Sequence, residues 1–143
     1  MTRTCPACGR ANRVPARHLA DQGRCGACQK ALPPPTQPID ADLATFDEIA
    51  NGARVPVLVD FWAAWCGPCR MAAPAVAAVA EELSGRALVV KVDTEAHPAL
   101  AARFNVRGIP NFLVLRHGRV VQQRAGLASA AEMRQWLVDA LAG

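Results

Sequence analysis

The sequence contains no apolar run long enough to cross a lipid bilayer. Its longest apolar stretch, residues 55–65, is interrupted by Asp60, whereas a membrane-spanning helix needs about 20 apolar residues. Residues 1–20 also lack a continuous apolar segment, so we expect no secretory signal peptide. Charged residues make up only 20% of the chain, which is low for a disordered protein. These absences predict a folded protein of the cytoplasm that has no membrane partner.

Acidic and aromatic side chains are scarce in the first part of the chain. Residues 1–38 hold six basic side chains and one acidic one, Asp21, while the remainder holds ten basic and eleven acidic ones. The net charge of +4 therefore belongs to this leader. No aromatic residue precedes Phe46, so the leader has no platform on which nucleic-acid bases could stack. We expect no nucleic-acid partner.

A proline-rich stretch separates this leader from the rest of the chain. Four prolines lie within residues 33–38, and proline disfavours both helix and sheet, so the stretch is predicted to be an extended spacer. A chain of 143 residues has room for one ordinary domain and a small attachment. We therefore expect a leader module at residues 1–32, a spacer at residues 33–38 and a main domain at residues 39–143.

The six cysteines form three Cys-x-x-Cys pairs, two of them in the leader. Sixteen residues separate Cys5 and Cys8 from Cys25 and Cys28, a spacing typical of a four-thiolate zinc site. A leader of this size cannot bury a real hydrophobic core, so a structural zinc ion would supply its folding energy. Its arginines would then offset the negative charge of the zinc–thiolate group. Leader disulfides or redox-labile thiols are the alternative.

Beyond the spacer, the apolar pattern alternates between helix and strand. We expect strands at residues 55–63 and 87–92, a hairpin of residues 112–115 and 120–123, and helices at residues 43–50, 67–83 and 97–104, with a final helix after Ser129. Asp42 suits the start of the first helix, and the spacing of Ser129 and Glu132 fits a capping box on the last. This order predicts an α/β protein, a mixed sheet with helices on both faces.

The third cysteine pair, Cys66 and Cys69, lies between a predicted buried strand and the start of a predicted helix. Unpaired N–H groups and a partial positive charge at a helix start favour a thiolate over a thiol. The spacing predicts Cys66 at an exposed tip and Cys69 about one turn further in, so that one sulfur can attack a disulfide and the other can resolve it. Half of a second metal site is the alternative, but no fourth pair exists to complete it.

The residues around this pair form a longer motif. Asp-Phe-Trp-Ala-Ala-Trp-Cys-Gly-Pro-Cys-Arg stands at 60–70, followed by Pro74, Lys-Val-Asp at 91–93, Val-Arg-Gly-Ile-Pro at 106–110 and Ala-Gly at 125–126. Over residues 39–143 this order resembles the thioredoxin family, and the leader is similar to that of its zinc-binding bacterial subclass, the thioredoxin 2 type. The resemblance implies a thioredoxin-like fold, a small zinc-ribbon-like module with one structural Zn²⁺, and no tightly bound organic cofactor.

The resemblance also implies a role for each residue of the dithiol site. Cys66 attacks a protein disulfide, and Cys69 then displaces the reduced partner. Asp60 is a carboxyl group in an apolar strand, where lost hydration raises its pKa and lets it exchange a proton with Cys69 through water. A structural ion pair with Lys91 is the alternative for Asp60, and we expect it to combine both roles. Trp62 is expected to support the site from the core.

A flat apolar rim for partner docking is implied around the dithiol, formed by Trp65, Gly67, Pro68, Ile109 and Gly126. Pro110 corresponds to the family's cis-proline, which would hold the Ile109 backbone ready to pair with a substrate strand; an ordinary trans proline is the alternative. The chain departs from the family at Asn111, where threonine is common, and at Ala64, where proline or an acidic residue is usual. Both are expected close to the rim, where they would affect partner preference.

These expectations combine into a protein-disulfide reductase that transfers electrons by thiol–disulfide exchange. We expect a monomer whose partners are disulfide-containing proteins and an NADPH-dependent thioredoxin reductase. The alternative is a zinc-controlled redox sensor or holdase chaperone, in which the leader captures partners and the third pair only reports redox state. Catalytic turnover distinguishes the two.

Overall fold

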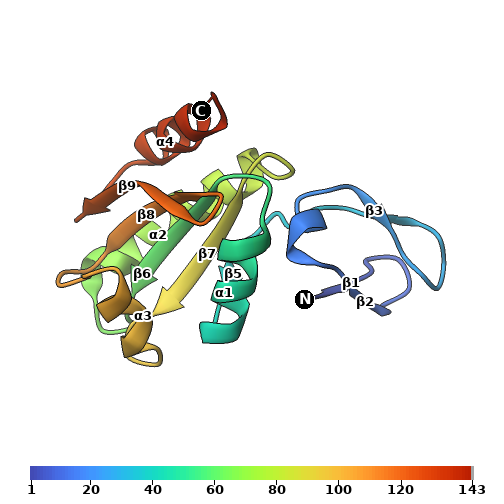
Figure 1. Cartoon of the computed structure of the whole chain (residues 1–143), viewed down its shortest axis with the longest axis horizontal. Coiled ribbons are helices and arrows are strands. Elements are labelled where there is room, and N and C mark those ends of the chain that lie inside the picture. The colour runs from blue at the N-terminus through green and yellow to red at the C-terminus, as the bar shows by residue number, and fades with distance from the viewer. Residues whose placement is uncertain (143) are drawn as a thin grey trace.

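A computed structural model describes residues 1–142, whose larger part is built on one mixed sheet (Figure 1). The strand order is β5-β7-β6-β8-β9, from β5 (Ile39–Asp40), β7 (Leu88–Asp93), β6 (Val57–Trp62), β8 (Asn111–Arg116) and β9 (Arg119–Ala125). The first three run parallel, whereas β8 and β9 are each antiparallel to the strand before them in this order. The predicted mixed sheet is confirmed, and the short edge strand β5 is an addition to it.

Helices cover both faces of the sheet. Helices α1 (Leu43–Gly52) and α3 (Pro98–Arg103) pack on one face, and α2 (Gly67–Glu82) and α4 (Ala130–Ala142) pack on the other. Strand β6 contributes to both cores because side chains alternate along a strand: Val59 and Phe61 join the first core, and Leu58 joins the second. By the same alternation, Asp60 lies on the α2 face of the sheet.

Two helix starts follow the predicted capping residues. The Asp42 carboxylate accepts a hydrogen bond from the Thr45 amide at 2.8 Å, at the start of α1. Before α4, Ser129 Oγ accepts from the Glu132 amide and Glu132 Oε1 accepts from the Ser129 amide, each at 3.1 Å. These side chains satisfy amides that have no partner within the first helical turn. Helix α2 continues through Pro74.

The leader folds as two β-ribbons joined by one turn of 3-10 helix. Strands β1 (Thr2–Thr4) and β2 (Ala11–Arg13) form the first ribbon, β3 (Gly23–Arg24) and β4 (Ala31–Leu32) form the second, and η1 (Ala16–His18) lies between them. Buried Leu19 joins the core that contains Phe46 and Ile49 of α1. The leader therefore packs directly on α1, as Figure 1 shows.

The proline-rich spacer is held against the turn that follows α2. It contains neither helix nor strand, and Ser84 Oγ, just beyond the end of α2, donates a hydrogen bond to the Pro35 carbonyl at 2.9 Å. This contact fixes the leader near the C-terminal end of α2, whereas the third cysteine pair lies at its N-terminal end. None of the helices within residues 1–142 has the length and apolar character that crossing a bilayer requires.

Candidate active site and metal centre

The third cysteine pair lies where the chain leaves β6 and begins α2. The Cys66 amide donates to the Ala63 carbonyl at 3.1 Å, which closes the turn between the two elements. Cys66 is the N-cap of α2, and its sulfur accepts a hydrogen bond from the Cys69 amide at 3.2 Å. Pro68 occupies the first helical turn, where its missing N–H costs little. Cys66 and Cys69 form a disulfide, so this is the oxidised state of the pair.

Both sulfurs of the pair are covered by neighbouring residues. Cys66 is 3% exposed and Cys69 is 4% exposed, in a cluster with Ala63, Trp62 and Ile109. Cys66 Sγ also lies 3.7 Å from the Ile109 carbonyl oxygen. The exposed tip predicted for Cys66 is therefore wrong for this disulfide form, because the loop before β8 packs onto the sulfur that was expected to face solvent.

Asp60 is a buried carboxyl group without a hydrogen-bond partner on Oδ1. Its residue is only 2% exposed, and burial raises its pKa to about 6, while the positive charge of Lys91 acts in the opposite direction. The Lys91 ammonium lies 4.5 Å from the centroid of the Trp62 ring. Among residues 1–142, no direct ion pair joins Lys91 to Asp60. The carboxyl group has thus lost its hydration, and the Lys91 ammonium group does not form an ion pair with it.

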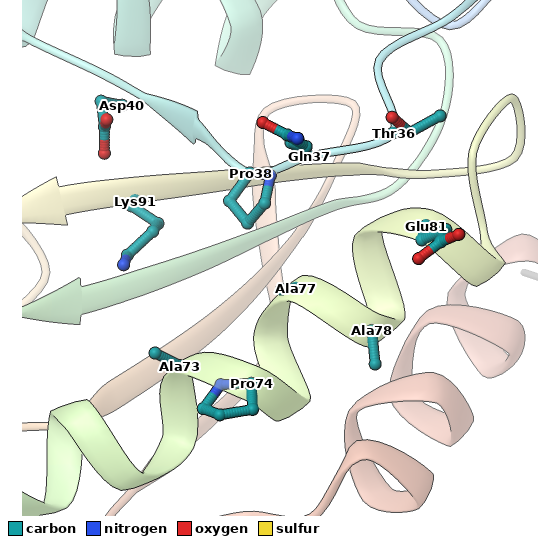
Figure 2. A pocket seen from close by; sticks show the side chains of 10 residues that line it. All are labelled: Thr36, Gln37, Pro38, Asp40, Ala73, Pro74, Ala77, Ala78, Glu81 and Lys91. Carbon is teal, nitrogen blue, oxygen red and sulfur yellow. The ribbon is translucent and has the colours of Figure 1, made fainter.

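A groove of about 610 Å³ runs between α2 and the end of the spacer (Figure 2). Lys91 lines the groove and pairs in strand register with Asp60 on β6 and with Asp40 on β5. Ala73 and Pro74 of α2 form part of its opposite wall (Figure 2). Lys91, the cross-strand neighbour of Asp60, is therefore open to this groove, whereas Asp60 is not part of the lining.

The rim residues expected from the sequence differ in solvent exposure and in the hydrogen bonds that they form. Trp65 is 66% exposed, and its Nε1 donates to Glu95 Oε1 at 2.8 Å. The peptide bond between Ile109 and Pro110 is cis, as the resemblance implied. The Pro110 side chain is buried, and its carbonyl accepts a hydrogen bond from the Gly126 amide at 2.8 Å. Pro110 and Gly126 are thereby tied together, and Trp65 is the prominent apolar group of the rim.

The two departures from the family pattern lie in different surroundings. Ala64 is exposed, and its carbonyl accepts a hydrogen bond from Arg70 Nη1 at 3.1 Å. Asn111 is buried, and its Oδ1 accepts from Gln123 Nε2 at 3.3 Å on the neighbouring strand β9. A cross-strand hydrogen bond therefore holds the Asn111 side chain within the sheet, and its expected place close to the rim, directly after Pro110, stays a prediction.

Sequence reasoning missed two residues that hold the rim. Glu95 fixes the Trp65 indole although thirty positions separate them, and Arg70 fixes the Ala64 carbonyl. An exposed glutamate after a strand has no distinguishing pattern, so only the folded chain identifies Glu95. Arg70 follows directly on the second cysteine, and its position at the start of a helix next to a tight turn could have indicated a contact with that turn.

The four leader cysteines converge on one point. Their sulfurs all lie within 4.8 Å of one another, with 3.7 Å between Cys5 and Cys28 and 3.6 Å between Cys8 and Cys25. Tetrahedral zinc with Zn–S bonds of about 2.3 Å requires sulfurs about 3.8 Å apart. The spacing and the donor set therefore fit one zinc ion, and the leader disulfides considered as an alternative are not formed.

Backbone amides and one side chain surround this cluster. The amides of Ala7 and Ala27 donate to the sulfurs of Cys5 and Cys25, each at 3.4 Å. Asn12 Nδ2 donates to Cys25 Sγ at 3.5 Å, and its Oδ1 accepts from the Gly26 amide at 2.9 Å. Hydrogen bonds from the backbone, together with the Asn12 donor, lower the pKa of Cys25 to about 6. Such donors favour the thiolates that zinc requires.

Comparison with known proteins follows the same division of the chain. Residues 37–139 match the family model described as Thioredoxin, and residues 4–30 match the one described as Thioredoxin 2, N-terminal. The chain belongs to the thioredoxin family. This membership confirms the family and the fold class predicted from the sequence, including a leader compatible with a zinc ribbon. It also makes the chain a thioredoxin-type disulfide oxidoreductase.

Individual thioredoxins agree with this assignment. Thioredoxin C-3 of Corynebacterium nephridii is 41% identical over 137 residues, which cover 96% of this chain and 93% of that protein. Thioredoxin 1 of Chlorobaculum tepidum is 42% identical over 97 residues, 68% of this chain and 96% of that protein. A solved thioredoxin variant from Halobacterium salinarum has a TM-score of 0.69 and 30% identity, covering 75% of this chain and 93% of that chain. The match to Thioredoxin C-3 thus extends over the leader as well as the sheet.

Proposed function

We propose that this thioredoxin is a protein-disulfide reductase whose reacting dithiol is Cys66 and Cys69. The observation that carries the proposal is the hydrogen bond of 3.2 Å from the Cys69 amide to the Cys66 sulfur, at the N-cap of the sixteen-residue helix α2. A donor aimed at this sulfur, in the positive field of a helix start, stabilises a thiolate more than a thiol. Cys66 is therefore the nucleophile of the reduced form.

The reaction transfers two electrons from this chain to a partner disulfide. The Cys66 thiolate attacks one partner sulfur, which forms a mixed disulfide and releases the other partner sulfur as a thiolate. The Cys69 thiol loses its proton and attacks Cys66 Sγ, which breaks the mixed disulfide and releases the second partner thiolate. The partner leaves as a dithiol, and this chain is left with the Cys66–Cys69 disulfide.

Asp60 is proposed to exchange the proton of Cys69 through a water molecule. A carboxyl group whose pKa is about 6 is partly protonated near neutral pH, so it can both accept and return a proton there. We propose that the proton then reaches solvent through the groove lined by Lys91, the cross-strand neighbour of Asp60. Lys91 and Trp62 act as positioning residues, since their stacking keeps the ammonium group near the carboxyl group without a direct ion pair.

The rim around the dithiol is proposed to dock the partner. Trp65, Gly67, Pro68, Ile109 and Gly126 form its contact surface, and buried Pro110 holds the loop beneath it. The Ile109 carbonyl, 3.7 Å from Cys66 Sγ, is in reach of a partner backbone N–H when the partner sulfur approaches Cys66. Backbone pairing of this kind is independent of side-chain identity, which suits an enzyme that acts on several proteins.

Cys5, Cys8, Cys25 and Cys28 are proposed to bind one structural zinc ion. Bound zinc would cross-link the two ribbons and supply folding energy to residues 1–32, with residues 33–38 as spacer and residues 39–143 as the catalytic domain. A closed four-sulfur shell leaves no position for a substrate, so no step of the exchange reaction involves the metal.

The recycling partner is proposed to be an NADPH-dependent thioredoxin reductase, and the chain is proposed to work as a monomer. Zinc thiolates and a recycled dithiol both require a reducing compartment, so we assign its activity to the cytoplasm. The test is reduction of insulin by NADPH and thioredoxin reductase, with and without this protein. Catalytic thiol release is expected, and Cys66→Ser is expected to abolish it. Absence of turnover in the wild type would instead favour the redox-sensor or holdase function.

A further inference from the structure

Three charged side chains form a row across one face of the sheet. The strand register pairs Lys91 of β7 with Asp40 of β5 on one side and with Asp60 of β6 on the other. The residue that precedes each of them belongs to, or packs against, the core beneath α1 and α3. Because side chains alternate along a strand, the three charged side chains lie on the opposite face, which α2 covers. A single ammonium group therefore stands between two carboxyl groups.

These two carboxyl groups differ in their access to solvent. Asp40 is exposed, and with Lys91 it lines both the groove between α2 and the end of the spacer (Figure 2) and a second cavity of about 400 Å³ at the start of α1. Asp60 is buried and lines neither. The Trp62 ring, over which the Lys91 ammonium group lies, also lines the second cavity. Lys91 thus borders a cavity that Asp40 shares and Asp60 does not.

Two further carboxylates line the second cavity, and each already accepts a hydrogen bond from the backbone. Asp42 Oδ1 accepts from an amide of α1 at 2.8 Å, and Asp93 Oδ1 accepts from an amide of the loop after β7 at 2.9 Å. Among residues 1–142, the hydrogen bonds and ion pairs made to carboxylates do not include Asp40. The Asp40 carboxylate is therefore the one in this cavity whose charge is left to attract Lys91.

The other titratable groups around the row lie further along the two cavities or do not titrate. His97, before α3, lines the second cavity, and Glu81 of α2 lies at the far end of the groove from Asp40 (Figure 2). On the other side of the row, the cross-strand neighbour of Asp60 on β8 is Phe112, which carries no charge. The cysteines at the start of α2 do not titrate in the disulfide state.

We propose that Asp40 is a positioning residue of the dithiol site, which holds the Lys91 ammonium group outward and prevents it from pairing with Asp60. Asp60 then remains basic enough to accept the proton of Cys69. This inference rests on the proton exchange proposed above for Asp60. Without the charge of Asp40, the ammonium group should settle closer to the Asp60 carboxylate and stabilise it.

The test is an NMR titration of the Asp60 carboxyl carbon in the oxidised, zinc-bound full chain labelled with ¹³C-aspartate. Asp40→Asn should lower the pH midpoint of this titration by about 0.5, which corresponds to an about threefold loss of proton affinity. The matched control, Glu81→Gln, removes a carboxylate from the far end of the same groove and should move the midpoint by less than about 0.1. Asp40→Glu keeps the charge and should retain the midpoint of the wild type.

A second background shows whether Asp40 acts through Lys91. In Lys91→Met, the further change Asp40→Asn should move the midpoint by less than half as much as it does in the wild type. Equal shifts in the two backgrounds would reduce the effect to direct repulsion between the carboxylates and overturn the positioning role. An Asp40→Asn midpoint no lower than that of Glu81→Gln would overturn it as well.

The titration does not depend on turnover, so it separates this inference from the proposed function. In single-turnover reduction of insulin, the acidic limb of the pH–rate profile of Asp40→Asn should move to lower pH by the same amount as the titration. A shifted titration with an unshifted rate profile would contradict the proton exchange proposed for Asp60 and would support the placement of Lys91 by Asp40.

Discussion

Asp60 and Lys91 stand directly opposite each other on the parallel strands β6 and β7, yet the Lys91 ammonium lies over the Trp62 ring rather than on the Asp60 carboxyl group. The carboxyl group loses its hydration on folding and gains no direct countercharge. Its pKa rises to about 6 for that reason, with burial the larger influence and Lys91 a partial opponent. The folded chain thus holds a proton more tightly at Asp60 than the unfolded chain does.

Replacement of this carboxyl group should stabilise the protein at neutral pH. Because the pKa of Asp60 is higher in the folded state, its ionisation destabilises the fold increasingly as pH rises from about 4 to above 6. Asp60→Asn should therefore raise the unfolding free energy by up to about 3 kcal/mol near pH 8 and by about half of that near pH 5. Urea unfolding of the oxidised, zinc-bound protein at both pH values measures this difference.

Glu81→Gln is the matched control for this measurement, because it removes an exposed carboxyl group from α2. It should change the unfolding free energy by less than about 0.5 kcal/mol at either pH. A stability gain for Asp60→Asn that does not depend on pH would contradict the assigned cause.

The order of attack in the dithiol predicts different behaviour for its two serine variants. Cys69→Ser keeps the attacking sulfur of Cys66 but lacks the group that resolves the mixed disulfide, so it should accumulate covalent complexes with disulfide substrates. Cys66→Ser should trap few. Non-reducing gel electrophoresis after incubation with oxidised insulin measures both, and comparable complexes from the two variants would contradict the order.

Asn12 should tune retention of the metal. Its side chain joins the Cys25 sulfur to the Gly26 amide, and loss of such an outer contact typically weakens metal binding by about 10- to 100-fold. Asn12→Ala is expected to release zinc to a colorimetric chelator at a correspondingly lower chelator concentration. Exposed Asn51 on α1 provides the control, and Asn51→Ala should retain zinc as the wild type does. Equal zinc affinity in the two variants would show that the Asn12 contact is unimportant.

Replacement of Gln29, in the turn after Cys28, should raise the stability of the protein. The turn after Cys8 has Gly9 at φ +78°, and the matching place after Cys28 has Gln29 at φ +64°, where a side chain is strained. Gln29→Gly should therefore stabilise the zinc-bound protein by about 0.5–1 kcal/mol in urea unfolding. Gln22→Gly, at a position without positive φ, should destabilise it by a similar amount. A loss of stability in both variants would rule out relief of strain.

Spacing and alternation indicated the cysteine cluster, the third cysteine pair and the buried carboxyl group, while the roles of these residues came from the resemblance to the thioredoxin family. The pairing of the cysteines indicated the metal cluster and the dithiol, because sulfurs two residues apart on a tight turn necessarily lie close together. Asp60 could be identified because a single carboxyl group interrupts an apolar strand. The starts of α1 and α4 followed from Asp42 and Ser129, whose side chains bond to amides only three positions away.

Contacts between distant parts of the chain could not be predicted in the same way. The link between Trp65 and Glu95, the packing of Leu19 on α1 and the burial of Cys66 beneath Ile109 all depend on how separate elements meet. Strand β5 has only two residues, too few to show alternation, and it exists because β7 offers a free edge beside the spacer. The hydrogen bond from Gln123 to Asn111 could not be predicted either, because Gln123 lies on a strand whose register the sequence does not specify.

The placement of the spacer at one end of α2 and of the dithiol at the other has a consequence for sulfur chemistry within a single molecule. A helix of sixteen residues is about 24 Å long, far beyond the reach of a cysteine side chain. The redox couple is therefore insulated from the metal thiolates of its own chain. Disulfide exchange between the leader cysteines and the Cys66–Cys69 pair therefore requires an encounter between two molecules. Its rate should rise with protein concentration, whereas the rate at which Cys66 and Cys69 form their own disulfide should not.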